Sequence, residues 1–220
     1  VLFRSSQVQV DRDLVYTSAM SGFSEDKSPA YEAPPSDGYV DKATFCRWVE
    51  RQERKYEWKG GRVVQMTNVT WAHSTIVMNF AFLLREHLGK EGWSIATTDF
   101  GVETDDSIRY PDVIVEPKDS ADPKRRRAIA PTIMVEVLSP SSGARDFVEK
   151  CAEYQTFPTL EAYIVASQDE PICWLWQRQP EATFPRYPEE IAGREASIEL
   201  SIQAIALPMS EIYADIPTTW

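Results

Sequence analysis

The distribution of apolar and polar residues predicts an α/β protein whose periodic segments begin near residue 41. Residues 1–40 are rich in Ser, Asp, Pro and Gly and have no apolar period, which is typical of a flexible or loosely attached arm. Periodic segments then follow one another closely through the rest of the chain. Because 220 residues are enough to bury one substantial core, we expect residues 41–220 to form a single domain.

The first periodic segments predict a short helix followed by a β-hairpin. Phe45 and Trp48 have helical spacing, and Asp41 is a suitable N-cap for the helix that would contain them. Residues 56–66 then form two short runs around a Gly-Gly pair, a pattern that favours a tight hairpin turn.

A longer amphipathic helix is predicted from about residue 71 to 88, and Gly89 supplies its stop signal. Apolar residues and two histidines recur along this segment at helical spacing. We expect the buried stripe to consist of His73, Ile76, Val77, Phe80, Leu83, Leu84 and His87.

Apolar runs in the rest of the chain predict a mixed sheet flanked by helices. The predicted strands lie around Ile95, around Val102, from Pro111, from Thr132, at 160–167 and at 172–178. A helix from about residue 144 to 157, capped by Ser141 or Ser142, separates the fourth strand from the fifth. Several antiparallel strands followed by strand, helix and strand indicate an α/β (α+β) arrangement with a mixed central sheet.

Two apolar strands each contain one acidic residue where burial is costly. Asp112 begins one strand, and Glu136 interrupts another 24 residues later. A buried carboxylate needs a cation, a hydrogen-bond donor or an ion-pair partner. If the strands are neighbours, both carboxylates meet at one point and offer the oxygen ligands that Mg²⁺ or Mn²⁺ prefers. The same pattern also allows a buried ion pair between Glu136 and either Arg109 or Lys150.

The helix after the Glu136 strand supplies a candidate catalytic cation. Asp146, Lys150 and Tyr154 recur every four residues on one face of this helix. The long stem of Lys150 can return its ammonium group to the carboxylates, where it would stabilise charge on a phosphate or orient an attacking water. The combination predicts metal-dependent phosphodiester hydrolysis. A carboxylate-pair glycosidase is the weaker alternative.

The charge balance limits how nucleic acid can bind. A net charge of −11 and a pI near 4.7 argue against a protein that coats nucleic acid with its whole surface, but they leave room for a local basic groove. Arg125, Arg126 and Arg127 lie between the two acid-bearing strands and are candidate phosphate contacts. The alternative for these arginines is an ordinary solvated loop.

Cysteine usage and hydropathy favour a cytoplasmic protein. The three cysteines are widely spaced and form no CxxC pair, which is typical of reduced thiols. No apolar run approaches the roughly 20 residues that a membrane span requires, so no membrane partner is expected. A homodimer is a candidate assembly, because nucleases that cut both strands of a duplex often follow its symmetry.

Several stretches of the chain resemble the Uma family of restriction-endonuclease-like proteins, within the PD-(D/E)XK nuclease superfamily. The resemblance rests on RYPDVIVE and on IMVEVLSPSSGARDFVEKCAEYQTFPTLEAYIVA. The upstream segment YEWKGGRVVQM and the helix that contains His73 also match, so that the resemblance covers roughly residues 41–177. It implies a restriction-endonuclease-like fold and a metal-dependent endonuclease that acts on DNA.

The resemblance also implies roles for single residues. Asp112 and Glu136 match the two acidic positions of the superfamily pattern, which implies that they bind Mg²⁺ or Mn²⁺. The chain departs from that pattern two residues after Glu136, where Leu138 replaces the expected lysine. The resemblance implies that Lys150 takes the missing role.

Two further residues, Glu57 and His73, match positions that border the site in the family. For His73, a satisfied core or capping histidine is the alternative. Because Leu138 replaces a lysine and the chain is acidic, a second hypothesis is a catalytically inactive relative that keeps the fold as a nucleic-acid-binding or protein-binding module.

Overall fold

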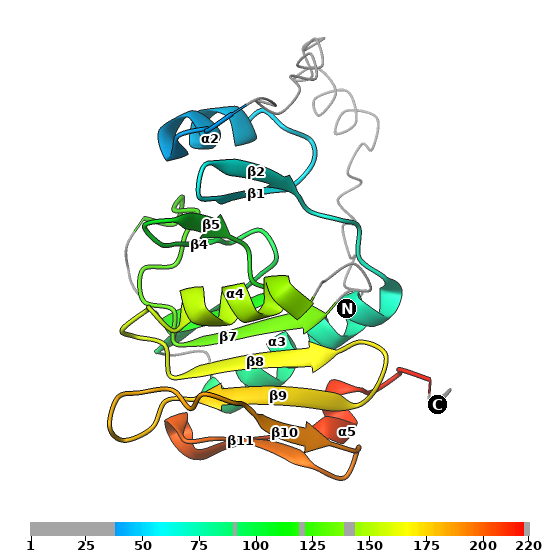
Figure 1. The fold of residues 1–220 in the computed structure, drawn as a ribbon. Helices are drawn as coiled ribbons and strands as arrows, with labels where there is room; N and C mark the ends of the chain where they lie inside the picture. Colours follow the sequence, from blue (N-terminus) through cyan, green and yellow to red (C-terminus); the bar gives the residue numbers. More distant parts are fainter. Residues whose placement is uncertain (1–37, 90–91, 119–121, 139–143, 218–220) are drawn as a thin grey trace, which may run out of the picture.

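A computed structural model of the protein describes residues 38–89, 92–118, 122–138 and 144–217. These residues form a four-stranded sheet, a six-stranded sheet and a two-stranded ribbon (Figure 1). Most of the predicted arm lies outside them. Val40 is buried and its backbone amide donates to the carbonyl of Gly61 at 2.9 Å, so regular packing already includes the residue before Asp41.

The four-stranded sheet and one helix form a small lobe at one end of the molecule (Figure 1). Its helix, α2 (Lys42–Val49), begins at the predicted N-cap, where Asp41 accepts from the backbone amide of Thr44 at 2.9 Å. The sheet contains β1 (Tyr56–Lys59), β2 (Arg62–Gln65), β4 (Val102–Glu103) and β5 (Ser107–Arg109), in the spatial order β2-β1-β5-β4. The predicted hairpin is confirmed. Gly60 and Gly61 both have positive φ, as the favoured two-residue hairpin turn requires.

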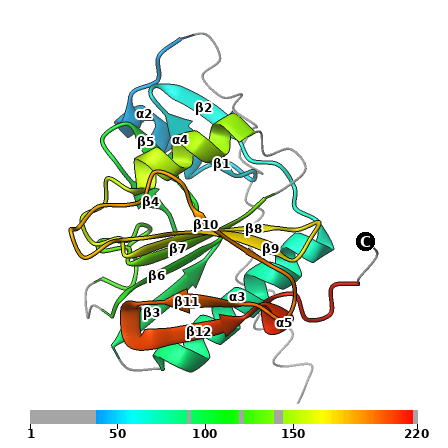
Figure 2. The same ribbon diagram turned by 60° about the horizontal axis from the view of Figure 1, so that its bottom comes forward.

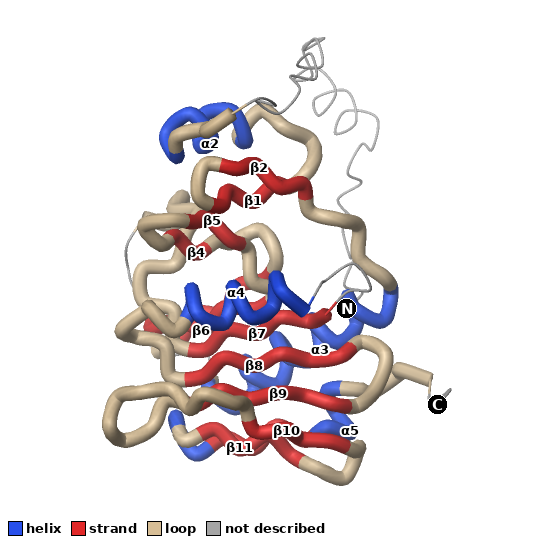
Figure 3. Tube along the Cα trace, in the orientation of Figure 1, coloured by secondary structure: helices blue, strands red, loops and turns tan. Residues whose placement is uncertain are grey.

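The six-stranded sheet carries the main core. It contains β3 (Trp93–Thr97), β6 (Val113–Pro117), β7 (Ile133–Leu138), β8 (Ala162–Ser167), β9 (Ile172–Gln177) and β10 (Glu189–Ala192). The spatial order of the strands is β10-β9-β8-β7-β6-β3, and Figure 3 shows β7, β8 and β9 side by side. The neighbours β7 and β8 run parallel, and every other neighbouring pair runs antiparallel. This arrangement confirms the predicted mixed sheet.

Different elements cover the two faces of the large sheet (Figure 2). One face is covered by two helices, α3 (Trp71–Leu88) and α5 (Met209–Ile212), and by the ribbon of β11 (Ser197–Leu200) and β12 (Ile205–Pro208) with the turn Ile202–Ala204 between them. The other face is covered by α4 (Ala144–Tyr154). Along β7, Val135 and Val137 join the core under α3, whereas Met134 joins the core under α4. The alternation of a strand therefore points Glu136 toward α4.

The long helix matches its prediction except at one histidine. Its boundaries are those predicted, and six of the seven residues in the expected stripe are buried. His87 is instead exposed, and Leu88 takes its place in the core. The predicted caps Ser141 and Ser142 lie outside the described residues.

No helix within the described ranges is long and apolar enough to cross a membrane. The three cysteines are free thiols. Burial, the first cause in each case, raises the pKa of Cys151 to about 11 and that of Cys173 to about 12. Both thiols therefore favour the neutral form and are unsuited to act as nucleophiles.

Candidate functional site

Asp112 lies at the start of β6, beside the middle of β7. The antiparallel register pairs Val113 with Val135, which brings the Asp112 side chain to the backbone of the next strand. Its Oδ2 accepts the amide of Val137 at 2.8 Å and lies 3.3 Å from Nε2 of His73. No described residue donates a hydrogen bond to the other oxygen, Oδ1. The contacts of Oδ2 thus fix the carboxylate in place.

Glu136 meets the helix that the sequence placed beside it. Lys150 Nζ lies 3.2 and 3.1 Å from the two carboxylate oxygens of Glu136, and Tyr154 Oη donates to Oε1 at 2.9 Å. The ion pair with Lys150 that the sequence left open is therefore present. The catalytic role of Lys150 stays a prediction, and the side chain of Asp146 lies outside the described part of the chain.

The surroundings of Glu136 raise its pKa above that of an ordinary glutamate. Burial is the largest effect on the pKa of Glu136 and raises it to about 7. The charge of Lys150 lowers this pKa, whereas the charges of Asp112 and Glu57 raise it. Burial also raises the pKa of Tyr154 well above its ordinary value, which keeps this phenol a hydrogen-bond donor. A carboxyl group whose pKa lies near neutrality, beside further carboxylates, is a place where added positive charge would be stabilised.

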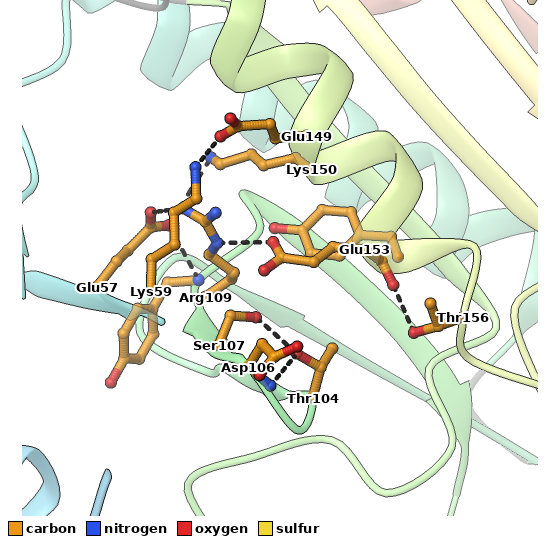
Figure 4. Close-up of polar contacts among 12 residues, drawn as sticks. Glu57, Lys59, Thr104, Asp106, Ser107, Arg109, Glu149, Lys150, Glu153 and Thr156 are labelled. Atoms are coloured by element: carbon orange, nitrogen blue, oxygen red, sulfur yellow. Dashed lines mark hydrogen bonds and ion pairs between the residues drawn. The ribbon is translucent and has the colours of Figure 1, made fainter. Parts of the chain in front are cut away.

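An arginine links the small lobe to this site (Figure 4). Arg109, at the end of β5, is 1% exposed, and its guanidinium donates to Glu57 Oε2 at 2.7 Å and to Glu153 Oε2 at 2.9 Å. The other oxygen of Glu57 lies 3.7 Å from Lys150 Nζ. Lys150 thus lies between Glu136 on the large sheet and Glu57 on the small one, so that both lobes fix its position.

Replacing Arg109 by methionine should destabilise the protein strongly. The change leaves the buried carboxylate of Glu57 without its closest partner and removes a partner of Glu153, and breaking a buried ion pair in this way costs about 3–5 kcal/mol. Urea unfolding measures the loss. The exposed Arg85→Met serves as control and should change the free energy of unfolding by no more than about 0.5 kcal/mol. A loss below about 1 kcal/mol for Arg109→Met would show that the link contributes little.

A cleft opens beside Asp112, with a volume of about 690 Å³. Both Asp112 and His73 line it, together with residues 53–55 after α2 and residues 65–69, which begin with the last residue of β2. His73 is 3% exposed, and its Nδ1 is buried without a hydrogen-bond partner among the described residues. The structure thus places His73 at the border of the site, where it orients Asp112. Its role in the reaction stays a prediction, as does that of Glu57.

The three arginines predicted as phosphate contacts are already engaged by carboxylates. Arg125 pairs with Glu116, Arg126 with Glu50 and Arg127 with Glu103. Arg125 also lies over the ring of Phe100, 4.9 Å from its centroid. These contacts hold the loop against the small lobe and the far end of β6, so a phosphate would have to compete with a carboxylate at each arginine. Phosphate binding there stays a prediction.

The donor set fits a divalent ion held by few protein ligands. In the described parts of the chain no group of three or more His, Cys, Asp and Glu side chains is arranged to hold a metal. Mg²⁺, however, is usually bound through one or two carboxylates, with water and substrate oxygens completing its shell. Among the described residues no donor contacts Oδ1 of Asp112, and the carboxylates of Asp112 and Glu57 disfavour the charge of Glu136. These two carboxylates would hold the ion.

Sequence reasoning missed the Arg109–Glu153 pair and the cleft. The sequence suggests only Glu136 as a partner of Arg109, because the polar run around β5 gives no strand signal. Without that strand, the packing of the small sheet against α4 cannot be predicted. The buried charge itself was the available signal: an arginine directly before Tyr-Pro-Asp in a folded chain requires carboxylate partners.

Comparisons with known proteins identify the family of the chain and relatives of its fold. A family model described as "Uma2: Putative restriction endonuclease" matches residues 43–210. Two uncharacterized proteins of Synechocystis sp. are also similar. The protein slr1290 is 28% identical over 169 residues, which cover 74% of this chain and 84% of its own length. The protein sll1609 is 26% identical over 171 residues, which cover 74% and 94%.

A solved structure shares the fold. The "putative nuclease belonging to DUF820 from Anabaena variabilis" matches with a TM-score of 0.62 at 15% identity, covering 74% of this chain and 91% of that one. At this identity the likeness concerns the fold. It confirms the predicted restriction-endonuclease-like fold, with a mixed central sheet flanked by helices.

Proposed function

Because the chain belongs to the Uma2 family, we propose that it is a divalent-metal-dependent endonuclease that hydrolyses phosphodiester bonds of DNA in the cytoplasm. The observation that carries the proposal is the convergence of Asp112, Glu136 and Lys150 from two neighbouring strands and the adjoining helix. Strand cleavage by the purified protein, compared with and without EDTA, tests it.

The site residues divide the work of hydrolysis among them. When bound, Mg²⁺ or Mn²⁺ supplies positive charge that polarises the phosphodiester and favours deprotonation of water. Asp112, fixed by His73 and by the amide of Val137, lines the cleft and would hold the ion there. The ammonium group of Lys150, 3.1 Å from Glu136, would donate a hydrogen bond where negative charge develops on phosphate.

Divalent-ion binding should strengthen as the pH rises toward 7. With its pKa near 7, Glu136 holds a proton at lower pH that the ion must displace, so affinity should rise about tenfold per pH unit below 7 and level off above it. Calorimetry with Mn²⁺ from pH 5.5 to 8.5, in two buffers of different ionisation enthalpy, measures both the affinity and the released proton. A flat affinity with no proton release would contradict this role for Glu136.

A second candidate is an inactive member of the family that binds DNA or a protein. Leu138 stands where the superfamily has a lysine, and Lys150 is held by two carboxylates, which favours a structural role for it. Such a protein would bind DNA equally well in EDTA, and Lys150→Ala would leave that binding unchanged. Metal-dependent cleavage excludes this candidate.

For cleavage of a duplex, we also propose a homodimer, because nucleases that cut both strands often follow the two-fold symmetry of the duplex. Light scattering coupled to gel filtration would detect it as twice the mass of the chain.

A further inference from the structure

The cleft beside Asp112 continues past Tyr110 into a second hollow. The second hollow has a volume of about 290 Å³ and extends to Gln52, beyond the end of α2. The two hollows share Glu53, Arg54, Lys55 and Tyr110 as lining residues. Together they form one track, called here the Tyr110 groove, that leads from Asp112 across the base of the small lobe.

Tyr110 is fixed at the boundary between the two hollows. It lies two residues before Asp112, and its backbone amide approaches Glu57 Oε1 at 3.5 Å. Its ring packs so closely on Gly101 that a Cβ there would lie 3.2 Å from Cε1. Tyr110 is half-buried and lines both hollows, so a ligand passing along the groove would meet an aromatic residue two positions before the candidate catalytic carboxylate.

The groove also offers the positive charges of Arg54 and Lys55. Arg54 is exposed, and no described residue forms an ion pair or hydrogen bond with it. Lys55 pairs with Asp99 at 2.6 Å, but both side chains are more than half exposed, and such surface pairs are weak. A phosphate at Arg54 would therefore displace no partner among the described residues, in contrast to a phosphate at Arg125 or Arg127.

These features fit an unpaired strand better than a duplex. A cleft of this size matches pockets that enclose small molecules, which corresponds to one or two nucleotides. A base can stack on an aromatic ring only if its face is free, and in a duplex the faces are covered by neighbouring base pairs. The side chain of Asp112 is only 14% exposed, so the phosphodiester must enter the cleft to reach it.

We propose that the Tyr110 groove binds an unpaired strand of DNA, with Arg54 contacting phosphate and Tyr110 stacking on a base next to the bond that is cut. The choice of DNA rests on the proposed function. The groove thus selects single strands, or nucleotides extruded from a duplex, and guides them to Asp112.

Fluorescence anisotropy tests the groove without cleavage. Full-length protein in EDTA is titrated against a labelled DNA strand, the corresponding duplex and an RNA strand of the same sequence. We expect the DNA strand to bind at least about tenfold more tightly than the duplex. Tyr110→Leu should weaken strand binding about tenfold, whereas Tyr110→Trp should retain it. Arg54→Ala should weaken it and reduce the salt dependence of log K by about 0.7 per lost phosphate contact.

Matched controls lie outside the groove. Arg85→Ala removes an exposed arginine from the far end of α3, and Tyr187→Leu removes a tyrosine that is 70% exposed on another loop. Neither should change strand binding. Equal or tighter binding of the duplex, a preference for RNA, or unchanged binding by both Arg54→Ala and Tyr110→Leu would overturn the proposal.

The same variants separate this inference from the proposed function. Strand binding that depends on Arg54 and Tyr110, in a protein that cleaves nothing with Mg²⁺ or Mn²⁺, would support the groove and contradict the nuclease. Metal-dependent cleavage of single strands at the wild-type rate by both Arg54→Ala and Tyr110→Leu would support the nuclease and contradict the groove.

Discussion

Glu136→Gln should abolish metal-dependent cleavage, lowering its rate by about 1,000-fold or more. The substitution keeps the size of the side chain and an oxygen that can accept from Tyr154, but it removes the negative charge that a divalent ion requires. Calorimetry with Mn²⁺ should show binding that is lost in the same variant. Cleavage rates of a labelled DNA strand, measured at saturating metal, give the size of the effect.

The control for this change is Glu199→Gln, which removes an exposed carboxylate from β11 on the other side of the large sheet. It should cleave and bind metal like the wild type. A Glu136→Gln variant that still binds Mn²⁺ with wild-type affinity would show that the ion, if any, is held elsewhere.

Lys150→Ala should move cleavage and metal affinity in opposite directions. Its ammonium group lies 3.1 Å from Glu136 and 3.7 Å from Glu57, so its removal takes away the positive charge that competes with a divalent ion. Metal affinity should therefore rise. Cleavage should nevertheless fall by about 100- to 1,000-fold, because the hydrogen-bond donor to the developing phosphate charge is lost.

Lys59→Ala is the matched control, because Lys59 also contacts α4, through Glu149, but is no part of the candidate catalytic group (Figure 4). It should leave both quantities close to wild type. If Lys150→Ala lost cleavage and metal binding together, the lysine would serve to build the site rather than to act in the reaction.

Sequence patterns predicted that Asp112, Glu136 and Lys150 lie together, because these residues belong to elements that follow one another along the chain. Asp112 and Glu136 each break an apolar strand, and two acids 24 residues apart fit adjacent strands joined by one loop; the structure pairs these strands antiparallel. Lys150 follows one loop later on a helix whose four-residue spacing fixes its face. Local periodicity and short connections were sufficient to bring the three together.

The rest of the site depends on contacts that no local pattern encodes. β5 has three residues, and its buried Ser107 and Arg109 resemble a polar loop in the sequence. β10 and β11 were missed for a similar reason, since three of the four residues of β10 and two of the four of β11 are not buried. Without β5, the proximity of Glu57 to Lys150 could not be predicted, because it depends on how the small sheet packs against α4.

Burial also decided cases that spacing could not. His87 has helical spacing with the apolar stripe of α3, yet the helix continues its stripe through Leu88 and leaves the histidine exposed. His73 occupies the opposite end, where the helix meets Asp112. Two histidines with the same apparent pattern therefore have different surroundings, and only the fold around each end of the helix distinguishes them.

The most direct test of the account is cleavage of supercoiled plasmid and of a labelled single strand by the purified wild-type protein in Mg²⁺, Mn²⁺ or EDTA. We predict cleavage that requires the metal, is absent in EDTA and is absent in Glu136→Gln. Cleavage that persists in EDTA, or in Glu136→Gln at the wild-type rate, would contradict a catalytic metal site at Asp112 and Glu136. No cleavage of either substrate, with no metal bound, would instead assign the protein to the inactive binding modules.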